Sequence, residues 1–192
     1  MEDLDTQPIY LKDYQPPAFL VEHVALEFTL HPTATRVRST VKFRKNPDSP
    51  VTEFFLHGEN LNLLSSYING VAVSSIVTKA GLTCEVPEAP FIWQSEVEID
   101  PSANTSLSGL YMSNGMFCTQ CEAEGFRRIT YYPDRPDVMA PFDVTIHSDL
   151  PYALSNGESL GREGHTTRWQ DPWPKPAYLF ALVGGDFEVY SD

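Results

Sequence analysis

Residues 24–43, VALEFTLHPTATRVRSTVKF, contain two segments in which apolar and polar side chains alternate. The first segment, residues 24–30, places valine, leucine and phenylalanine at every second position. The second, residues 36–43, places its apolar residues at odd positions among arginine, threonine and lysine. Because successive side chains of a strand point to opposite faces, this pattern predicts two β-strands with one face in a core and the other in water.

The same alternation recurs in residues 97–100 and 142–147. Asn69-Gly70 and Asn114-Gly115 each separate two short extended segments, and both residue types tolerate the positive φ of a two-residue hairpin turn. Sixteen prolines and eleven glycines limit helix formation. These features predict an all-β fold: one antiparallel, sandwich-like, saddle-shaped domain over residues 1–192. At most one short helical turn is expected, near residues 135–140, with Pro136 at its first position.

Length and composition fit one domain with a sizeable core, since 42% of the 192 residues are hydrophobic. No run of apolar residues reaches the roughly 18 that a membrane helix needs, so no membrane segment is expected. The N-terminal residues are acidic and polar, which argues against a secretory signal. Three cysteines suit free thiols in a reducing compartment, and we expect a cytoplasmic protein.

The net charge is −13 and the pI about 4.7. Such a negative field repels phosphate backbones, so nucleic-acid binding is not expected. It attracts cations, and the amino terminus of a peptide is a cation. General solubility accounts for the charge without any ligand and is the simpler interpretation.

The segment from Cys118 to Asp137, CTQCEAEGFRRITYYPDRPD, is the most polar and most chemically varied part of the chain. In an extended segment residues two apart point to the same side, so Gln120 and Glu122 are expected to converge on one ligand. A carboxylate and an amide carbonyl suit an α-ammonium group, which offers three N–H donors. From composition alone, a solvated strand edge without a ligand is the favoured interpretation of the segment.

The same segment resembles the amine-recognition segment of bacterial aminopeptidase N, a family of zinc exopeptidases among the gluzincins. The resemblance lies in residues 119–127, 129–132 and 134–137, and it continues over nearly the whole chain. It implies that Glu122 grips the amino terminus of a peptide substrate. It also implies that Gln120 lines the pocket for the first side chain.

The resemblance stops short of the catalytic motifs of that family. None of the five histidines is followed by Glu or has a second His four residues later, and no Gly-x-Met-Glu-Asn motif is present. The resemblance therefore implies the amino-terminal domain of a larger zinc aminopeptidase. The zinc, its ligands and the catalytic domain of the same polypeptide are expected beyond Asp192, and this chain alone is expected to be inactive.

Several neighbouring residues are expected to have structural roles. The charged residues of 127–137 should pair with one another as a scaffold for the recognition segment, with Tyr131-Tyr132 packed on the core. Cys118 and Cys121 lack the second ligand pair of a zinc site and are expected to be packed thiols. Trp169 and Trp173 stand beside prolines and are expected to plug one end of the sandwich, although sugar stacking is an alternative. The alternative function is accordingly a free-standing β-sandwich module that binds carbohydrate or protein.

Overall fold

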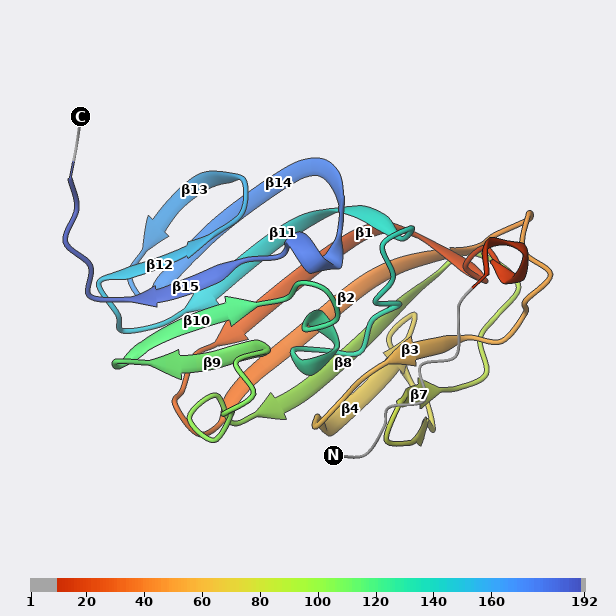
Figure 1. The fold of residues 1–192 in the computed structure, drawn as a ribbon, viewed down its shortest axis with the longest axis horizontal. Coiled ribbons are helices and arrows are strands. Elements are labelled where there is room, and N and C mark those ends of the chain that lie inside the picture. Colours follow the sequence, from red (N-terminus) through yellow and green to blue (C-terminus); the bar gives the residue numbers. More distant parts are fainter. Residues whose placement is uncertain (1–9, 191–192) are drawn as a thin grey trace.

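The computed structural model describes residues 10–190 of the chain. Among these residues it has fifteen strands in three sheets and three short 3₁₀ turns, which confirms the all-β prediction (Figure 1). Residues 1–9, on which the argument against a secretory signal largely depends, lie outside the described residues. No helix among residues 10–190 is long and apolar enough to cross a membrane.

The largest sheet has eight strands, in the order β13-β14-β11-β1-β2-β8-β4-β5. All four segments predicted from alternation belong to it and are confirmed as strands. Its strands are β1 (Phe19–Thr29), β2 (Thr35–Lys45), β4 (Asn62–Ile68), β5 (Val71–Ala72), β8 (Phe91–Ile99), β11 (Met139–His147), β13 (Glu158–Glu163) and β14 (Thr166–Pro176).

Two smaller sheets lie in front of the large sheet in Figure 1. One has the order β12-β15-β10-β9 and the other β3-β7-β6. Their strands are β3 (Phe55–His57), β6 (Ile76–Val77), β7 (Gly81–Thr83), β9 (Gly109–Ser113), β10 (Met116–Gln120), β12 (Tyr152–Ser155) and β15 (Leu182–Gly185).

The pairing of the strands is mixed in one place. Strands β1 and β11 run parallel, from Val24 beside Phe142 to Thr29 beside His147. The other strand pairs of residues 10–190 are antiparallel. The prediction of an antiparallel domain thus holds except at this junction, where two segments more than one hundred residues apart in sequence meet.

The core lies between the large sheet and the two smaller ones. The inward faces of β1, β2, β8 and β11 supply its aliphatic and aromatic side chains, including the fully buried Trp93. Phe28 of β1 stacks on Phe180 at 5.9 Å between ring centroids. Phe54, just before β3, packs edge-on against Phe43 of β2 at 5.2 Å. Edge-on and offset aromatic pairs of this kind are favourable beyond the area that they bury.

Local turn chemistry confirms two predictions and corrects one. Both hairpins form: Asn69-Gly70 joins β4 to β5 and Asn114-Gly115 joins β9 to β10, with all four residues at positive φ. The prediction of a helical turn near residues 135–140 is wrong, because no helical turn is assigned there. The chain makes a single tight turn, closed by the hydrogen bond from Val138 N to Arg135 O, and then enters β11.

The expected number of helical turns is also wrong. Three 3₁₀ turns form instead of one, at η1 (Leu11–Asp13), η2 (Phe126–Arg128) and η3 (Ala177–Leu179). Each has only three residues, which is too short to show an apolar helical repeat in the sequence.

Candidate functional site

The candidate site is the turn that follows strand β10. The strand ends at Gln120, and residues 121–125, here called the recognition turn, lead into η2. The turn is closed by a 2.8 Å hydrogen bond from Gly125 N to Cys121 O. A Cβ on Gly125 would overlap the carbonyl oxygen of Gln120, so this close return of the backbone requires glycine.

The structure brings Gln120 and Glu122 together, but not as two positions on one strand face. The chain leaves β10 after Gln120, so the argument from alternation does not apply to Glu122. Instead the Gln120 side-chain Nε2 donates a hydrogen bond to the backbone oxygen of Glu122 at 3.3 Å. Both side chains are exposed, so both are open to a ligand.

Three glutamates lie in or beside the recognition turn, and they differ in their partners. Glu124 pairs with Arg127 (Oε1 to Nη2, 3.2 Å). Glu59, from the loop after β3, pairs with Arg128 (Oε2 to Nη2, 3.0 Å). The Glu122 carboxylate has no ion-pair or hydrogen-bond partner among residues 10–190. Glu122 therefore presents the free negative charge of the turn.

The buried ion pair of Arg127 with Asp134 holds the segment that follows the recognition turn. Arg127 donates from its backbone N and from Nε to the same Asp134 Oδ2, both at 3.1 Å, and from Nη2 to Asp134 O at 3.1 Å. The Asp134 side chain is 2% exposed and that of Arg127 12%. The prediction that the charged residues of the segment pair with one another is confirmed for Arg127 and Asp134, whereas Arg128 pairs with Glu59 outside the segment. The bidentate pair of Arg135 with Asp137 is a second pair within the segment.

The electrostatics of the scaffold follow from burial. Burial raises the pKa of the Asp134 carboxyl above its ordinary value, while the hydrogen bonds and charge of Arg127 oppose that rise. Burial and the nearby positive charge of Arg127 lower the pKa of His57. The neutral imidazole accepts a 3.1 Å hydrogen bond at Nδ1 from the backbone N–H of Asp134.

Sequence reasoning missed Glu59 and His57. Both precede the recognition turn by more than sixty residues, and an isolated bridge between His57 and Tyr132 brings them near it. Glu59 N also donates to Arg127 O at 3.0 Å. Neither residue lies in a motif, so only the tertiary pairing reveals them.

The predicted packing roles are confirmed for the two tyrosines and for Cys121, whereas Cys118 is only partly buried. Tyr131 and Tyr132 are buried in the core. Cys118 and Cys121 form no disulfide, and burial raises the pKa of the Cys121 thiol to about 12, which suppresses the reactive thiolate. Residues 10–190 contain no group of three or more potential metal ligands.

The prediction that both tryptophans plug the sandwich is half wrong. Trp169 is partly buried and donates from Nε1 to Ala153 O at 3.0 Å. Trp173 is 78% exposed. Between Phe142 and Ala140, β11 has one unpaired residue where β14 has three, so Trp173 protrudes from an irregularity in the pairing.

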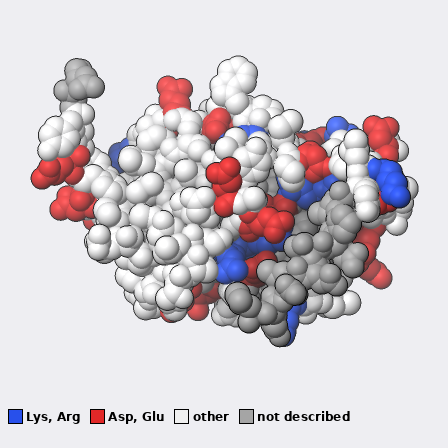
Figure 2. Space-filling model, in the orientation of Figure 1, with Lys and Arg blue, Asp and Glu red and all other residues white. Residues whose placement is uncertain are grey.

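The outward side of the four-stranded sheet borders the recognition turn and carries no charged side chain. Strands β9, β10, β12 and β15 contain no Lys, Arg, Asp or Glu. Figure 2 shows this region as a white surface, whereas charged side chains gather nearer the middle of the same view. We call it the uncharged face; its larger members are Tyr111, Met116, Cys118, Tyr152, Leu154 and Val183.

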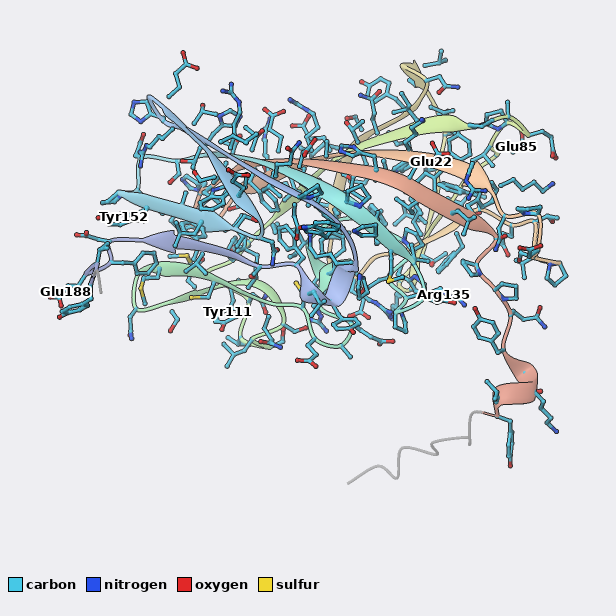
Figure 3. All side chains as sticks on the ribbon, turned by 90° about the horizontal axis from the view of Figure 1, so that it is seen from above. Glu22, Glu85, Tyr111, Arg135, Tyr152 and Glu188 are labelled. Atoms are coloured by element: carbon cyan, nitrogen blue, oxygen red, sulfur yellow. The ribbon has the colours of Figure 1, made fainter. Side chains whose placement is uncertain are left out.

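The register aligns part of this face across all four strands. Tyr111 pairs with Cys118, Cys118 with Val183, and Val183 with Leu154. In Figure 3, Tyr111 lies on the side that faces the viewer of Figure 1, and Glu22 and Glu85 lie on the opposite side. A contiguous surface of this composition is typical of an interaction site.

The chain is similar to known aminopeptidases. Aminopeptidase N of Caulobacter vibrioides is 47% identical over 97% of this chain and 23% of its own length. Aminopeptidase N of Escherichia coli is 42% identical over 97% of this chain and 22% of its own length. The chain therefore spans less than a quarter of the length of these relatives.

Structural similarity agrees with this. The crystal structure of Legionella pneumophila aminopeptidase A in complex with aspartic acid superposes with a TM-score of 0.85 and 34% sequence identity, over 93% of this chain and 22% of that chain. The family model described as the Peptidase M1 N-terminal domain matches residues 14–179. Since that match includes most of the fold and the recognition turn, the chain belongs to the Peptidase M1 N-terminal domain family.

Proposed function

We propose that this chain is the substrate-recognition domain of a zinc aminopeptidase that removes amino-terminal residues from peptides. Membership in the Peptidase M1 N-terminal domain family supports the class of enzyme. The complex of the Legionella relative with aspartic acid, a ligand with an α-amine, supports the class of ligand. Because the chain matches less than a quarter of each relative, the activity belongs in this proposal to a longer polypeptide.

One observation carries the proposal: Glu122 is the glutamate of the recognition turn that is left without a partner among the described residues. An α-ammonium group offers three N–H donors and one positive charge, and a carboxylate on a fixed backbone satisfies both requirements. Gln120, tied to the same turn, is proposed to line the pocket for the first side chain. Its Oε1 is available to accept a hydrogen bond while Nε2 holds the turn.

The catalytic part of the same polypeptide is the proposed partner of the uncharged face. That face ends beside Gln120, so a domain docked on it would place its own site next to Glu122. In this arrangement the chain supplies one wall of the cleft and the group that anchors the substrate amine. Anchoring the amine fixes which peptide bond reaches the catalytic group, because only the first bond lies at the required distance.

The zinc of this family does not fit the residues described here. Residues 10–190 provide no cluster of three His, Cys, Asp or Glu side chains that could hold a metal. We therefore expect the 192-residue chain alone to bind no stoichiometric zinc after dialysis and to leave an aminoacyl anilide unhydrolysed. Stoichiometric zinc, or turnover that a chelator abolishes, would show that the chain has its own metal site.

The experiment that tests the recognition role compares two neighbouring glutamates in the full-length polypeptide. Glu122→Gln keeps the size of the side chain and removes its charge. Hydrogen bonds to charged groups contribute about 1.5–3 kcal/mol, so kcat/KM for an aminoacyl anilide should fall about ten- to a hundredfold.

Glu124→Gln is the matched control, since its carboxylate is turned toward Arg127 and the amide oxygen of glutamine can still accept a hydrogen bond from Arg127 Nη2. We expect its effect on kcat/KM to be much smaller. Equal losses in both variants, or no loss in Glu122→Gln, would show that Glu122 is not the amine-binding acid.

A further inference from the structure

A buried carboxylate contacts the arginine that follows the recognition turn. Asp134 lies beneath the turn with its side chain almost fully buried, and it follows Glu122 by twelve residues. Its carboxylate accepts from both the backbone N and the side-chain Nε of Arg127. One carboxylate oxygen therefore fixes the backbone of η2 and the direction of the Arg127 side chain together.

Arg127 in turn contacts the recognition turn. Its Nη2 reaches Glu124 in the turn at 3.2 Å, and its backbone oxygen accepts from Glu59 N. At the other end, Gly125 O accepts a hydrogen bond from Arg128 N at 3.0 Å. The recognition turn is thus fastened to η2 at two points, and η2 is fastened to the protein interior through Asp134.

Stability alone does not account for such an arrangement. Removing two charges from water is costly, and a buried ion pair often contributes no more to stability than well-packed apolar side chains of the same volume. Its fork geometry does fix orientation, because an arginine that donates at several points has few alternative positions. The backbone of Asp134 is itself held by His57 Nδ1.

We propose that Asp134 is a positioning residue that, through Arg127, sets where the Glu122 carboxylate stands toward the ammonium group of the ligand. This inference rests on the proposed function of Glu122. In this account Glu122 binds the ammonium group, Asp134 orients Arg127, and Arg127 contacts the recognition turn that carries Glu122.

A double-mutant cycle in the full-length polypeptide tests the inference. Misplacement of a binding group by about 1 Å can cost about a hundredfold, so Asp134→Asn should lower kcat/KM for an aminoacyl anilide about ten- to a hundredfold. In the Glu122→Gln background the same change should cost less than about threefold, because residues that act through one another are not additive.

The control is Asp171→Asn, which removes the charge of one partner in a separate, largely buried ion pair, Lys175–Asp171 on β14, where Nζ and Oδ2 are 2.9 Å apart. It should lower the thermal midpoint as Asp134→Asn does and leave kcat/KM within about twofold of wild type, because additive effects are expected for unconnected sites. If Asp134→Asn does not fold, Arg127→Lys replaces it, since lysine keeps the charge but loses the fork.

The possible outcomes separate the two proposals. An unchanged kcat/KM in Glu122→Gln would overturn the proposed function. A loss in Glu122→Gln together with an unchanged kcat/KM in Asp134→Asn would overturn only the positioning role. Equal losses from Asp134→Asn in both backgrounds would also overturn it, because they would reveal a general effect on folding or charge.

Discussion

Gly125 packs directly against the carbonyl oxygen of Gln120, so the recognition turn closes back onto the end of the strand that precedes it. A Cβ on Gly125 would also lie 2.9 Å from Cys121 Cα and 2.9 Å from Gly109 N. All three neighbours are backbone atoms, which cannot move aside as the end of a flexible side chain can. The position of Glu122 therefore depends on the absence of a side chain three residues later.

Gly125→Ala is predicted to lower both stability and activity. Its φ of −78° is one that alanine adopts freely, so the cost comes from overlap alone, about 1–3 kcal/mol of unfolding free energy. The overlap should also displace Glu122 and reduce kcat/KM of the full-length polypeptide at least about tenfold, since a displaced binding group weakens transition-state binding.

Gly115→Ala provides the comparison. Gly115 has a φ of +80° and no atom within 4 Å of the added Cβ, so its variant should lose about 1–2 kcal/mol through the left-handed backbone. Its kcat/KM should stay at the wild-type value. Similar activity losses in the two variants would show that the packing of Gly125 is not what positions the turn.

The stability of this chain is predicted to depend on pH through His57. Burial and the charge of Arg127 lower its pKa below the ordinary 6.5. On acidification the unfolded chain therefore takes up a proton near pH 6.5 before the folded chain does. The free energy of unfolding should fall as pH drops from about 6.5 toward the lower pKa of the folded state.

Urea unfolding of wild type and His57→Asn at about pH 7.5 and about pH 5 checks this sign, because asparagine keeps an acceptor oxygen but does not titrate. The difference between the two proteins isolates His57 from the other histidines. We expect wild type to lose more stability than the variant between the two pH values. A larger loss in the variant would mean that folding favours the protonated imidazole.

The two tryptophans Trp93 and Trp173 should differ sharply. Trp93 is fully buried between the sheets, and Trp93→Ala should cost about 3–5 kcal/mol. Trp173 protrudes into solvent, and Trp173→Ala should change the unfolding free energy by less than about 0.5 kcal/mol. Chemical denaturation of both variants measures this. A large loss in Trp173→Ala would restore the rejected prediction that this residue plugs the sandwich.

The fold could be predicted from sequence wherever the determining interactions are local. Alternation gives the strands of the large sheet because one face of each is buried, and Asn-Gly gives the hairpins because of its backbone preference. The parallel pairing of β1 with β11 has no such signal, since it depends on which distant strands meet. The prediction that Trp173 is buried was wrong, because the residue type alone does not show on which side of an irregular strand the side chain lies.

The candidate site shows the same division. Glu122 and Gln120 could be named from their chemistry and from family resemblance, and that assignment stays a prediction. The argument that Gln120 and Glu122 share one strand face was wrong, because β10 ends at Gln120. The chain then turns back, which Gly125 permits, so Glu122 is not part of the strand. Glu59 and His57 could not be named, because a single bridge to Tyr132 brings them to the site.

The central claim is that the charge of Glu122 binds the α-ammonium group of the ligand. It is tested most directly by inhibition constants of the full-length polypeptide for two ligands, an amino acid amide and its analogue without the amine, in wild type and Glu122→Gln. We expect the variant to reduce the preference for the amine-bearing ligand about ten- to a hundredfold and to bind the other ligand within about twofold of wild type. An unchanged preference, or an equal loss for both ligands, would contradict the assignment of Glu122.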